Sequence, residues 1–188
     1  SRGLGDVYKR QINNNTITDI LNKIEVKAGD VVMVKAGTIH AIGAGVFICE
    51  IQQNSNCTYR MYDYDRRDKF GNPRELHVKK ALDVVDNHKY IKDNKTEVVI
   101  ARNEHFTEER LVQCKYFEVY KYDVNDEAKI TVDEASFVSV LFINGSGTIE
   151  TDDYEKTMEF KAGDSFFVSA GLRSIIIKGQ ATMVVTRV

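Results

Sequence analysis

The sequence is poor in the features that mark secreted, disulfide-rich and membrane proteins. It has three cysteines, Cys49, Cys57 and Cys114, and no pair of them has the CxxC spacing. The odd number and the spacing argue against a disulfide framework and against a cysteine zinc knuckle. No apolar run approaches the roughly 18 residues of a membrane helix, and no secretory signal pattern opens the chain. We therefore expect a cytoplasmic protein with reduced thiols and no membrane partner.

Excess charge, proline and tryptophan are also scarce. Lys and Arg number 26 against 28 Asp and Glu, which gives a net charge of −2, and the chain has one proline and no tryptophan. This balance carries no electrostatic footprint for nucleic acid. The motifs GxxxxGK[ST] and GxGxxG are absent, so the sequence predicts neither of these nucleotide-binding loops. Hydrophobic residues at 43% of 188 positions are typical of a globular protein with one or two small domains.

Short β-rich runs with glycine turns between them make up most of the chain. Most of these runs have four to eight residues, and this length favours an antiparallel sandwich or barrel. Asn144-Gly145 is a strong signal for a tight turn after one such run, and we interpret the following Ser146-Gly147 as part of that turn. The predicted strands are residues 31–34, 46–48, 136–143, 165–168, 174–177 and 181–185.

One helix is predicted over residues 73–88. Asn72 is a suitable cap, Pro73 suits the first helical position, and Glu75 lies three residues after the cap. The apolar residues that follow have helical spacing: Val78, Ala81, Leu82 and Val85. The polar stretch at residues 86–97 is predicted to be a linker.

An internal repeat links the two halves of the chain. Residues 25–38 and 159–172 match at eight of 14 positions without a gap. We interpret each copy as a turn, a buried strand and a second turn. His40 in the first copy corresponds to Ser174 in the second, so a function of this histidine would survive only in the first copy.

The segment 37–67 holds the candidate chemical residues. His40 follows a small-residue turn and either binds a metal or is a surface or satisfied core residue. Glu50 stands among apolar neighbours and is a paired carboxylate, a metal ligand or a base, unless it ends a strand in solvent. Arg60 lies in an alternating run that should put it on one face with Thr58 and Tyr62. It would bind an anion there, or else pair with Asp63 or Asp65.

The other charged and imidazole groups carry weaker signals. The alternating-sign run at residues 63–69 is typical of a solvated loop and is given no function of its own. The remaining histidines, His77, His88 and His105, lie in polar or helical settings and are expected to be structural or exposed.

The stretches AGTIHAIGAG, EIQQNS, TYRMYDYDRRD and GNPRELHVKKALDV resemble the bacterial class of type I mannose-6-phosphate isomerase. The resemblance runs continuously from Glu25 to Val85, and residues 95–188 are similar to the family's C-terminal β-domain with weaker motifs. It implies a mainly β cupin or jelly-roll fold. It also implies the interconversion of mannose 6-phosphate and fructose 6-phosphate through an enediol, with one zinc ion and a sugar phosphate as partner.

The resemblance also assigns residues. It implies that His40 is the last zinc ligand, that Arg60 is the active-site arginine and that Glu50 is an acidic residue near the reacting carbons. Lys35 replaces the proline of the family's turn but leaves the histidine in register. The family's other zinc ligands, a Gln-x-His pair and a Glu, lie upstream of the matched region, and no Gln-x-His occurs in this chain.

These points define the expected organisation. We expect a non-native leader at residues 1–11, the C-terminal part of an incomplete catalytic cupin at 12–93 and a second, degenerate cupin-like β-domain at 94–188. We interpret the chain as an N-terminally truncated fragment that is inactive alone. The alternatives are a non-catalytic sugar-binding or regulatory cupin and, less favoured with only four histidines, another metal cupin such as a dioxygenase.

Overall fold

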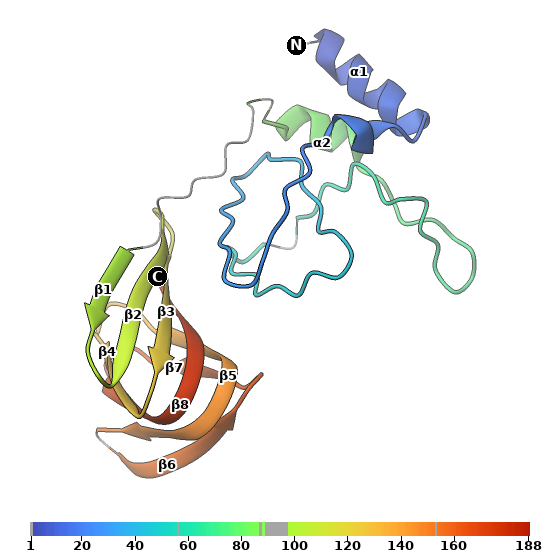
Figure 1. The fold of residues 1–188 in the computed structure, drawn as a ribbon. Helices are drawn as coiled ribbons and strands as arrows, with labels where there is room; N and C mark the ends of the chain where they lie inside the picture. Colours follow the sequence, from blue (N-terminus) through green and yellow to red (C-terminus); the bar gives the residue numbers. More distant parts are fainter. Residues whose placement is uncertain (1, 56, 87, 89–97, 153) are drawn as a thin grey trace. The chain divides into compact units, whose positions relative to one another are not determined.

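The computed structural model describes residues 2–55, 57–86, 88, 98–152 and 154–188 (Figure 1). The chain divides into two compact units, Ser1–Lys92 and Asp93–Val188, which we describe separately. Within the described residues, no helix has both the length and the apolar character needed to cross a membrane.

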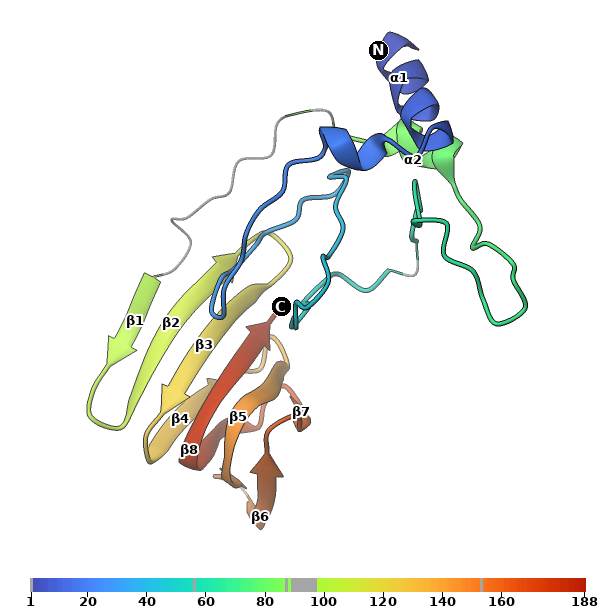
Figure 2. The ribbon, with the colours of Figure 1, turned by 45° about the vertical axis from the view of Figure 1, so that its right-hand side comes forward.

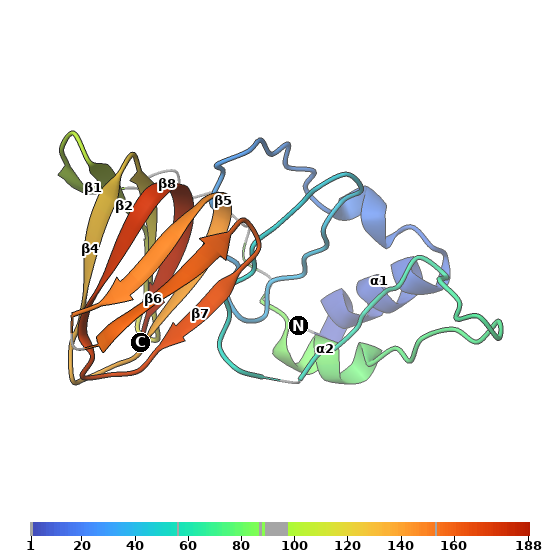
Figure 3. The ribbon, with the colours of Figure 1, turned by 90° about the horizontal axis from the view of Figure 1, so that it is seen from below.

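The second unit is an antiparallel sheet of eight strands in its described residues. Hydrogen-bonded neighbours follow the order β1-β2-β3-β8-β5-β6, while β4 also pairs with β8 and β7 with β5. Figure 2 shows β1, β2 and β3 side by side, and Figure 3 shows how β5, β6 and β7 fold over the other strands. The strands are Val98–Arg102 (β1), Phe106–Gln113 (β2), Glu118–Val124 (β3), Glu127–Val132 (β4), Val138–Thr151 (β5), Tyr154–Lys161 (β6), Ser165–Val168 (β7) and Arg173–Arg187 (β8).

Period-two alternation builds the core of this unit. In β4, Ala128, Ile130 and Val132 are buried while the residues between them are exposed. Successive side chains of a strand point to opposite faces, so one face of the sheet fills the interior. Phe142 and Phe160 stack there with ring centroids 3.7 Å apart. The predicted β-rich architecture is confirmed in this unit.

The predicted turn at Asn144-Gly145 is wrong, because β5 continues through it to Thr151. The pairing with β8 shifts register between Phe142 and Asn144 and then resumes. Gly145 has φ +88°, and a Cβ at this position would clash with the backbone oxygen of Gln180. Gly145 therefore lies at a bulge in a long strand. Pairing of β5 with β8 before and after this bulge outweighs the local preference of Asn144-Gly145 for a turn.

The first unit contains two α-helices, α1 at Arg2–Asn13 and α2 at Val78–Val84, and the 3-10 helix η1 at Ile17–Ile20. They share a small apolar core of Ile12, Ile17, Met61 and Ala81. The expectation that residues 1–11 are a non-native leader stays a prediction, although most of them lie in α1.

The strands predicted at 31–34 and 46–48 are wrong, because no strand is assigned among the described residues from 21 to 77. Only an isolated bridge between Arg67 and Pro73 pairs two backbones there. Most apolar side chains of these segments are exposed, with Phe47 96% exposed, while Val31 and Met33 are half-buried. A strand gains its hydrogen bonds and its burial from a neighbour, and these segments have none in the described chain.

The bounds predicted for the helix at 73–88 are also wrong. Helix α2 begins at Val78 and ends at Val84. Pro73 lies in the bridge to Arg67, and the N–H of Asn72 donates to Asp68 Oδ1 at 2.9 Å, so neither residue caps a helix. Of the predicted linker at 86–97, residue 87 and residues 89–97 lie outside the described residues.

The repeat produces matching first turns in the two units. The N–H of Asp30 donates to the oxygen of Lys27 at 3.1 Å, and the N–H of Asp164 donates to that of Lys161 at 3.1 Å. In both copies the aspartate side chain accepts the N–H of the same lysine, at 3.2 and 2.9 Å. The copies differ beyond the turn, because only the second continues into a strand, β7.

Candidate functional site

The turn before His40 is fixed against the end of α2. Gly37 has φ +83°, and a Cβ there would meet the backbone oxygen of Val84 at 2.7 Å. The N–H of Asp86 donates to the oxygen of Gly37 at 2.8 Å. This contact requires glycine and sets where the chain leaves the turn. His40 itself is exposed, and its Nδ1 lies 2.9 Å from the oxygen of Thr38, which leaves Nε2 as the nitrogen open to a ligand.

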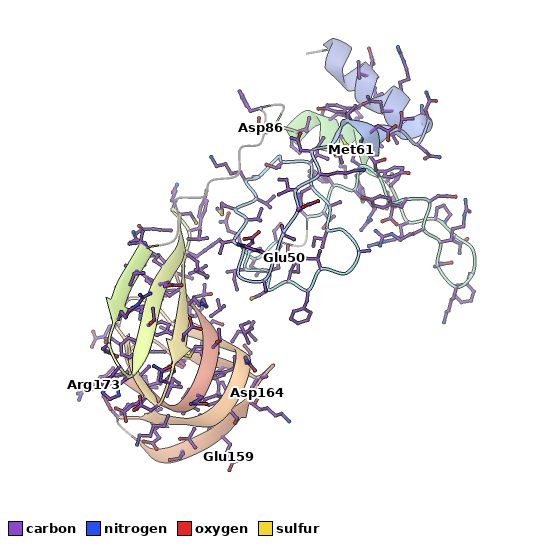
Figure 4. All side chains as sticks on the ribbon, in the orientation of Figure 1. Glu50, Met61, Asp86, Glu159, Asp164 and Arg173 are labelled. Atoms are coloured by element: carbon purple, nitrogen blue, oxygen red, sulfur yellow. The ribbon has the colours of Figure 1, made fainter. Side chains whose placement is uncertain are left out.

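Glu50 lies on an irregular segment and is exposed, as Figure 4 shows where it is labelled. Its neighbours Phe47 and Ile48 are exposed as well. The apolar surroundings suggested by the sequence are therefore not formed around it in the described chain. No hydrogen bond or ion pair of the described residues joins Glu50 to His40 or to Arg60.

Arg60 is held at its backbone and at its guanidinium. Its N–H donates to His77 Nδ1 at 3.3 Å, and its oxygen accepts the N–H of His77 at 2.7 Å. Its Nη1 donates to the oxygen of Glu75 at 3.2 Å, and the side chain is 20% exposed. No strand is assigned here, and the predicted shared face with Thr58 and Tyr62 stays a prediction.

Asp63 gathers three arginines at one of its oxygens. Its Oδ1 accepts from Arg66 Nη2 at 2.9 Å and lies 3.6 Å from Arg74 Nη1 and 3.9 Å from Arg60 Nε. Asp63 is 7% exposed, whereas Arg66 and Arg74 are 62% and 52% exposed. One carboxylate cannot neutralise three guanidiniums, so two positive charges face outward. We call Arg60, Asp63, Arg66 and Arg74 the arginine cluster.

Sequence reasoning identified Arg60 in this cluster but not Arg66 or Arg74. The alternating-sign run was interpreted as a solvated loop without a function, and Arg74 was placed in a helix. The one available signal was the spacing, because Asp63 lies three residues from both Arg60 and Arg66. The alternative of an ion pair between Arg60 and Asp63 is what the structure forms.

A zinc site does not fit the described residues. No group of three or more His, Cys, Asp or Glu side chains among them is arranged to hold a metal ion. Zinc in proteins takes three or four protein ligands, and His40 supplies one imidazole. The other histidines serve elsewhere: His77 bonds Arg60, His88 is 94% exposed, and His105 pairs with Asp126 in the second unit.

The second unit resembles a known family of domains. Residues 107–188 match the family model "Mannose-6-phosphate isomerase, cupin domain". The sequence motifs of this region are weaker than those of residues 25–85. The match covers β2 to β8 and agrees with the cupin jelly-roll fold that the sequence predicted.

Curated relatives cover both units. "Putative mannose-6-phosphate isomerase YvyI" of Bacillus subtilis is 41% identical over 182 residues, which is 94% of this chain and 54% of the relative. Mannose-6-phosphate isomerase ManA of the same organism is 34% identical over 89% of this chain and 52% of its own length. The chain thus spans about half the length of the curated relatives it matches.

A solved structure agrees with these relatives. The crystal structure of the mannose 6-phosphate isomerase from Bacillus subtilis superposes with a TM-score of 0.63 at 39% identity, over 72% of this chain and 42% of that one. Sequence and structural similarity lead to the same conclusion. The chain belongs to the mannose-6-phosphate isomerase family.

Proposed function

We propose that this chain supplies part of an enzyme that interconverts mannose 6-phosphate and fructose 6-phosphate in the cytoplasm, and that the chain alone turns over little substrate. Membership of the family supports the reaction, and the arginine cluster supports the substrate class. The cluster is the observation on which the proposal depends. Three guanidiniums around one buried carboxylate form a positive patch that suits a phosphate monoester, because guanidinium groups bind phosphate oxygens in pairs.

Within this cluster the arginines differ in freedom. Arg66 and Arg74 are 62% and 52% exposed; Arg66 also donates from Nε to the backbone oxygen of Asp63 at 3.4 Å, whereas Arg74 contacts only the carboxylate among the described residues. Arg60 is bonded at Nη1 to the backbone of Glu75 and so has a fixed direction. We propose that Arg66 and Arg74 bind the phosphate, and that Arg60 supplies a fixed charge beside it or beside the enediolate.

The reaction moves one proton between neighbouring carbons. A base removes the proton from C2 of the aldose, the electron pair forms the C1–C2 double bond, and the C1 carbonyl π bond opens as O1 takes up a proton, which gives the enediol. Return of a proton to C1, with loss of the O2 proton, gives the ketose, so atoms and charge balance without an oxidant. We propose Glu50 as the group that carries or orients this proton, which requires that its surroundings differ from the exposed position described above.

The family resemblance assigns zinc to this reaction, and the described residues of this chain do not complete such a site. We propose that His40 contributes one ligand and that this chain alone holds zinc weakly.

A coupled assay tests the proposal. Mannose 6-phosphate is supplied to the purified chain and to a full-length family member with the same site residues, and fructose 6-phosphate is measured. We expect turnover in the full-length protein and little in this chain. Binding of mannose 6-phosphate should weaken in the double variant Arg66→Gln and Arg74→Gln. Arg67→Gln, whose guanidinium contacts Asp65 and the backbone of Gly71, is the matched control.

A non-catalytic sugar-binding or regulatory cupin is the second candidate. The observation that favours it is the solitary His40 among the described residues of the candidate site. It predicts binding of the sugar phosphate without turnover in either protein. Turnover in the full-length protein that depends on Arg60 would exclude it.

A further inference from the structure

A group of polar side chains lies on the interior face of the second unit, where β2, β3 and β8 are adjacent. We call it the interior polar cluster. Tyr122 is 2% exposed and belongs to the hydrophobic core, and Tyr120 packs against that core. Both therefore point to the inside of the sheet. The members of the cluster are Glu108, Arg110, Glu118, Tyr120, Tyr122 and Arg187.

Strand register brings the charged members to the same face. Arg110 lies opposite Tyr120 across β2 and β3, and Arg187 lies opposite Glu118 across β3 and β8. Residues directly opposite in antiparallel strands share a face with Cβ atoms about 5 Å apart. The two arginines therefore lie on either side of β3 and face the same interior.

The acceptors of the cluster already have donors. The hydroxyl of Tyr122 donates to Glu108 Oε1 at 2.6 Å, and that of Tyr120 donates to Glu118 Oε2 at 2.6 Å. The amide of Gln113 donates to the other oxygen of Glu118. The carboxylates are thus engaged by neutral donors rather than by the arginines.

One buried donor of the two arginines is left without an acceptor. Within the described part of the chain, neither Arg110 nor Arg187 forms an ion pair with a carboxylate. Nε of Arg187 is buried and has no hydrogen bond there. A buried donor without an acceptor costs about 1 to 3 kcal/mol. This arrangement requires an acceptor from outside the described side chains.

Both arginines neighbour Tyr120, which lies opposite Arg110 in the strand register. The Arg187 guanidinium carbon is 5.5 Å from the centre of the Tyr120 ring. Burial and the hydrogen bond to Glu118 raise the pKa of Tyr120, and the charges of Arg187 and Arg110 oppose this rise. The strands on either side of β3 thus each place one arginine on this face.

Solvent reaches the two arginines from one side. Arg110, Glu118, Tyr120 and Arg187 are half-buried, whereas Tyr122 beneath them is buried. Interior-facing positions that keep some exposure lie where the sheet is open. A small ligand can therefore approach the arginines without entering the packed core.

We propose that the interior polar cluster binds a small oxyanion, a phosphate or a phosphate monoester, between Arg110 and Arg187. A tetrahedral oxyanion offers several acceptors to the fork of donors on a guanidinium. It would supply the acceptor that Arg187 Nε lacks. The inference uses none of the residues proposed for the isomerase reaction and does not rest on that activity.

Site-resolved NMR of the whole chain tests the proposal. Inorganic phosphate is titrated while the Nε–Hε signals of Arg187 and Arg110 are followed, which separates this site from the arginine cluster of the first unit. We expect saturable shifts with a dissociation constant of about 1 mM or tighter. Absence of a shift at Arg187 would overturn the proposal and would mean that water satisfies its Nε.

Single-residue variants test whether phosphate binds specifically at this cluster. Arg187→Gln and Arg110→Gln should each weaken binding by about tenfold, the effect of one lost charge-assisted hydrogen bond. Arg102→Gln is the matched control, because Arg102 is 66% exposed and its Nη2 lies 4.0 Å from Glu109. Equal weakening in the control would contradict a specific site. Should a variant unfold, the wild-type titration alone decides.

Two further ligands identify the source of the oxyanion. Mannose 6-phosphate binding more tightly than inorganic phosphate, with no shift from mannose, identifies a sugar phosphate. Equal binding of the two phosphates identifies the phosphate group alone. A shift caused by mannose as strongly as by phosphate would overturn the proposal, since it would not depend on the anion. Loss of isomerase activity would leave all these outcomes unchanged.

Discussion

Two hydrogen bonds join Arg60 and His77, one between their backbones and one from the Arg60 backbone to the His77 ring. The N–H of His77 donates to the oxygen of Arg60 at 2.7 Å, and the N–H of Arg60 donates to Nδ1 of His77 at 3.3 Å. Nδ1 therefore carries no proton, so the neutral ring is protonated at Nε2. The segment that carries the arginine cluster is thereby tied to the residue that precedes α2.

His77→Ala should loosen this tie. The variant keeps the backbone bond but leaves the Arg60 N–H without an acceptor, so we expect faster amide exchange at Arg60. The free energy of unfolding of the first unit should fall by about 1 kcal/mol. His88→Ala is the control, since His88 is 94% exposed and should change neither quantity. Unchanged exchange at Arg60 would show that His77 Nδ1 contributes nothing.

Arg60→Ala should lower kcat in a full-length family member by about 100-fold or more, because a fixed positive charge stabilises developing negative charge. Steady-state kinetics with mannose 6-phosphate measure it. Arg67→Ala is the control. It removes the same charge from the same segment, but Arg67 contacts Asp65 instead of Asp63, so kcat should stay within about twofold of the wild-type value. An unchanged kcat in Arg60→Ala would contradict its assignment.

Zinc should be lost from this chain on dialysis against a chelator, since one imidazole holds the ion weakly. Metal analysis after dialysis is expected to find far less than one zinc per chain. His40→Ala should then make little difference to the metal content. Tight, stoichiometric zinc that depends on His40 would contradict this expectation and require ligands from other residues of the chain.

The ion pair of His105 and Asp126 should make the second unit pH-sensitive. The hydrogen bond to Asp126 raises the pKa of His105, and the hydrogen bond to His105 lowers the pKa of Asp126. The raised pKa gives stability that is complete below the ordinary histidine pKa of about 6.5 and is lost as pH rises through the folded value. The lowered pKa gives stability that is present above about 3.9 and is lost as pH falls.

NMR titration of His105 measures this coupling. Asp126→Asn should return the pKa of His105 toward its ordinary value, because it removes the main cause of the rise. Glu104→Gln should have a smaller effect, since Glu104 acts only through its charge, 3.5 Å from Nε2. Glu127 adds a similar minor contribution. A titration midpoint that Asp126→Asn does not move would refute the assignment of cause.

Gly145→Ala should destabilise the second unit by about 3 kcal/mol, through backbone strain at φ +88° and a clash with the oxygen of Gln180. Urea unfolding measures it. Gly163→Ala separates the two causes, because Gly163 has φ +93° but no atom within 4 Å of the place that a Cβ would take. That variant should cost about 1 kcal/mol. Equal losses in both would mean that the close approach to Gln180 relaxes freely.

Local patterns predicted part of the second unit, in β5, β7 and β8, whereas β1, β2, β3, β4 and β6 were not predicted. The runs at 165–168, 174–177 and 181–185 are all strands or parts of strands. The same signals failed at 31–34 and 46–48, although the KAGD turn before residue 31 forms as its copy does. A turn depends on neighbours in sequence, whereas a strand depends on a backbone elsewhere in the chain.

The candidate site was also predicted only in part. Arg60 was found through motif and residue type, but its companions Arg66 and Arg74 meet it only because Asp63 is buried among them. The helix bounds failed where Asp68 accepts the N–H of Asn72, since a local side-chain bond competed with the predicted cap. Which of several local options wins depends on contacts that a linear pattern does not contain.

The length of β8 has a consequence for biosynthesis. This strand pairs with β3, β4 and β5, all of which precede it in the sequence. As the polypeptide leaves the ribosome, those three strands emerge before their shared neighbour exists. Their contacts span long separations, which slows folding and prolongs the exposure of apolar edges. The nascent second unit should therefore depend on chaperones until residues 173–187 have emerged.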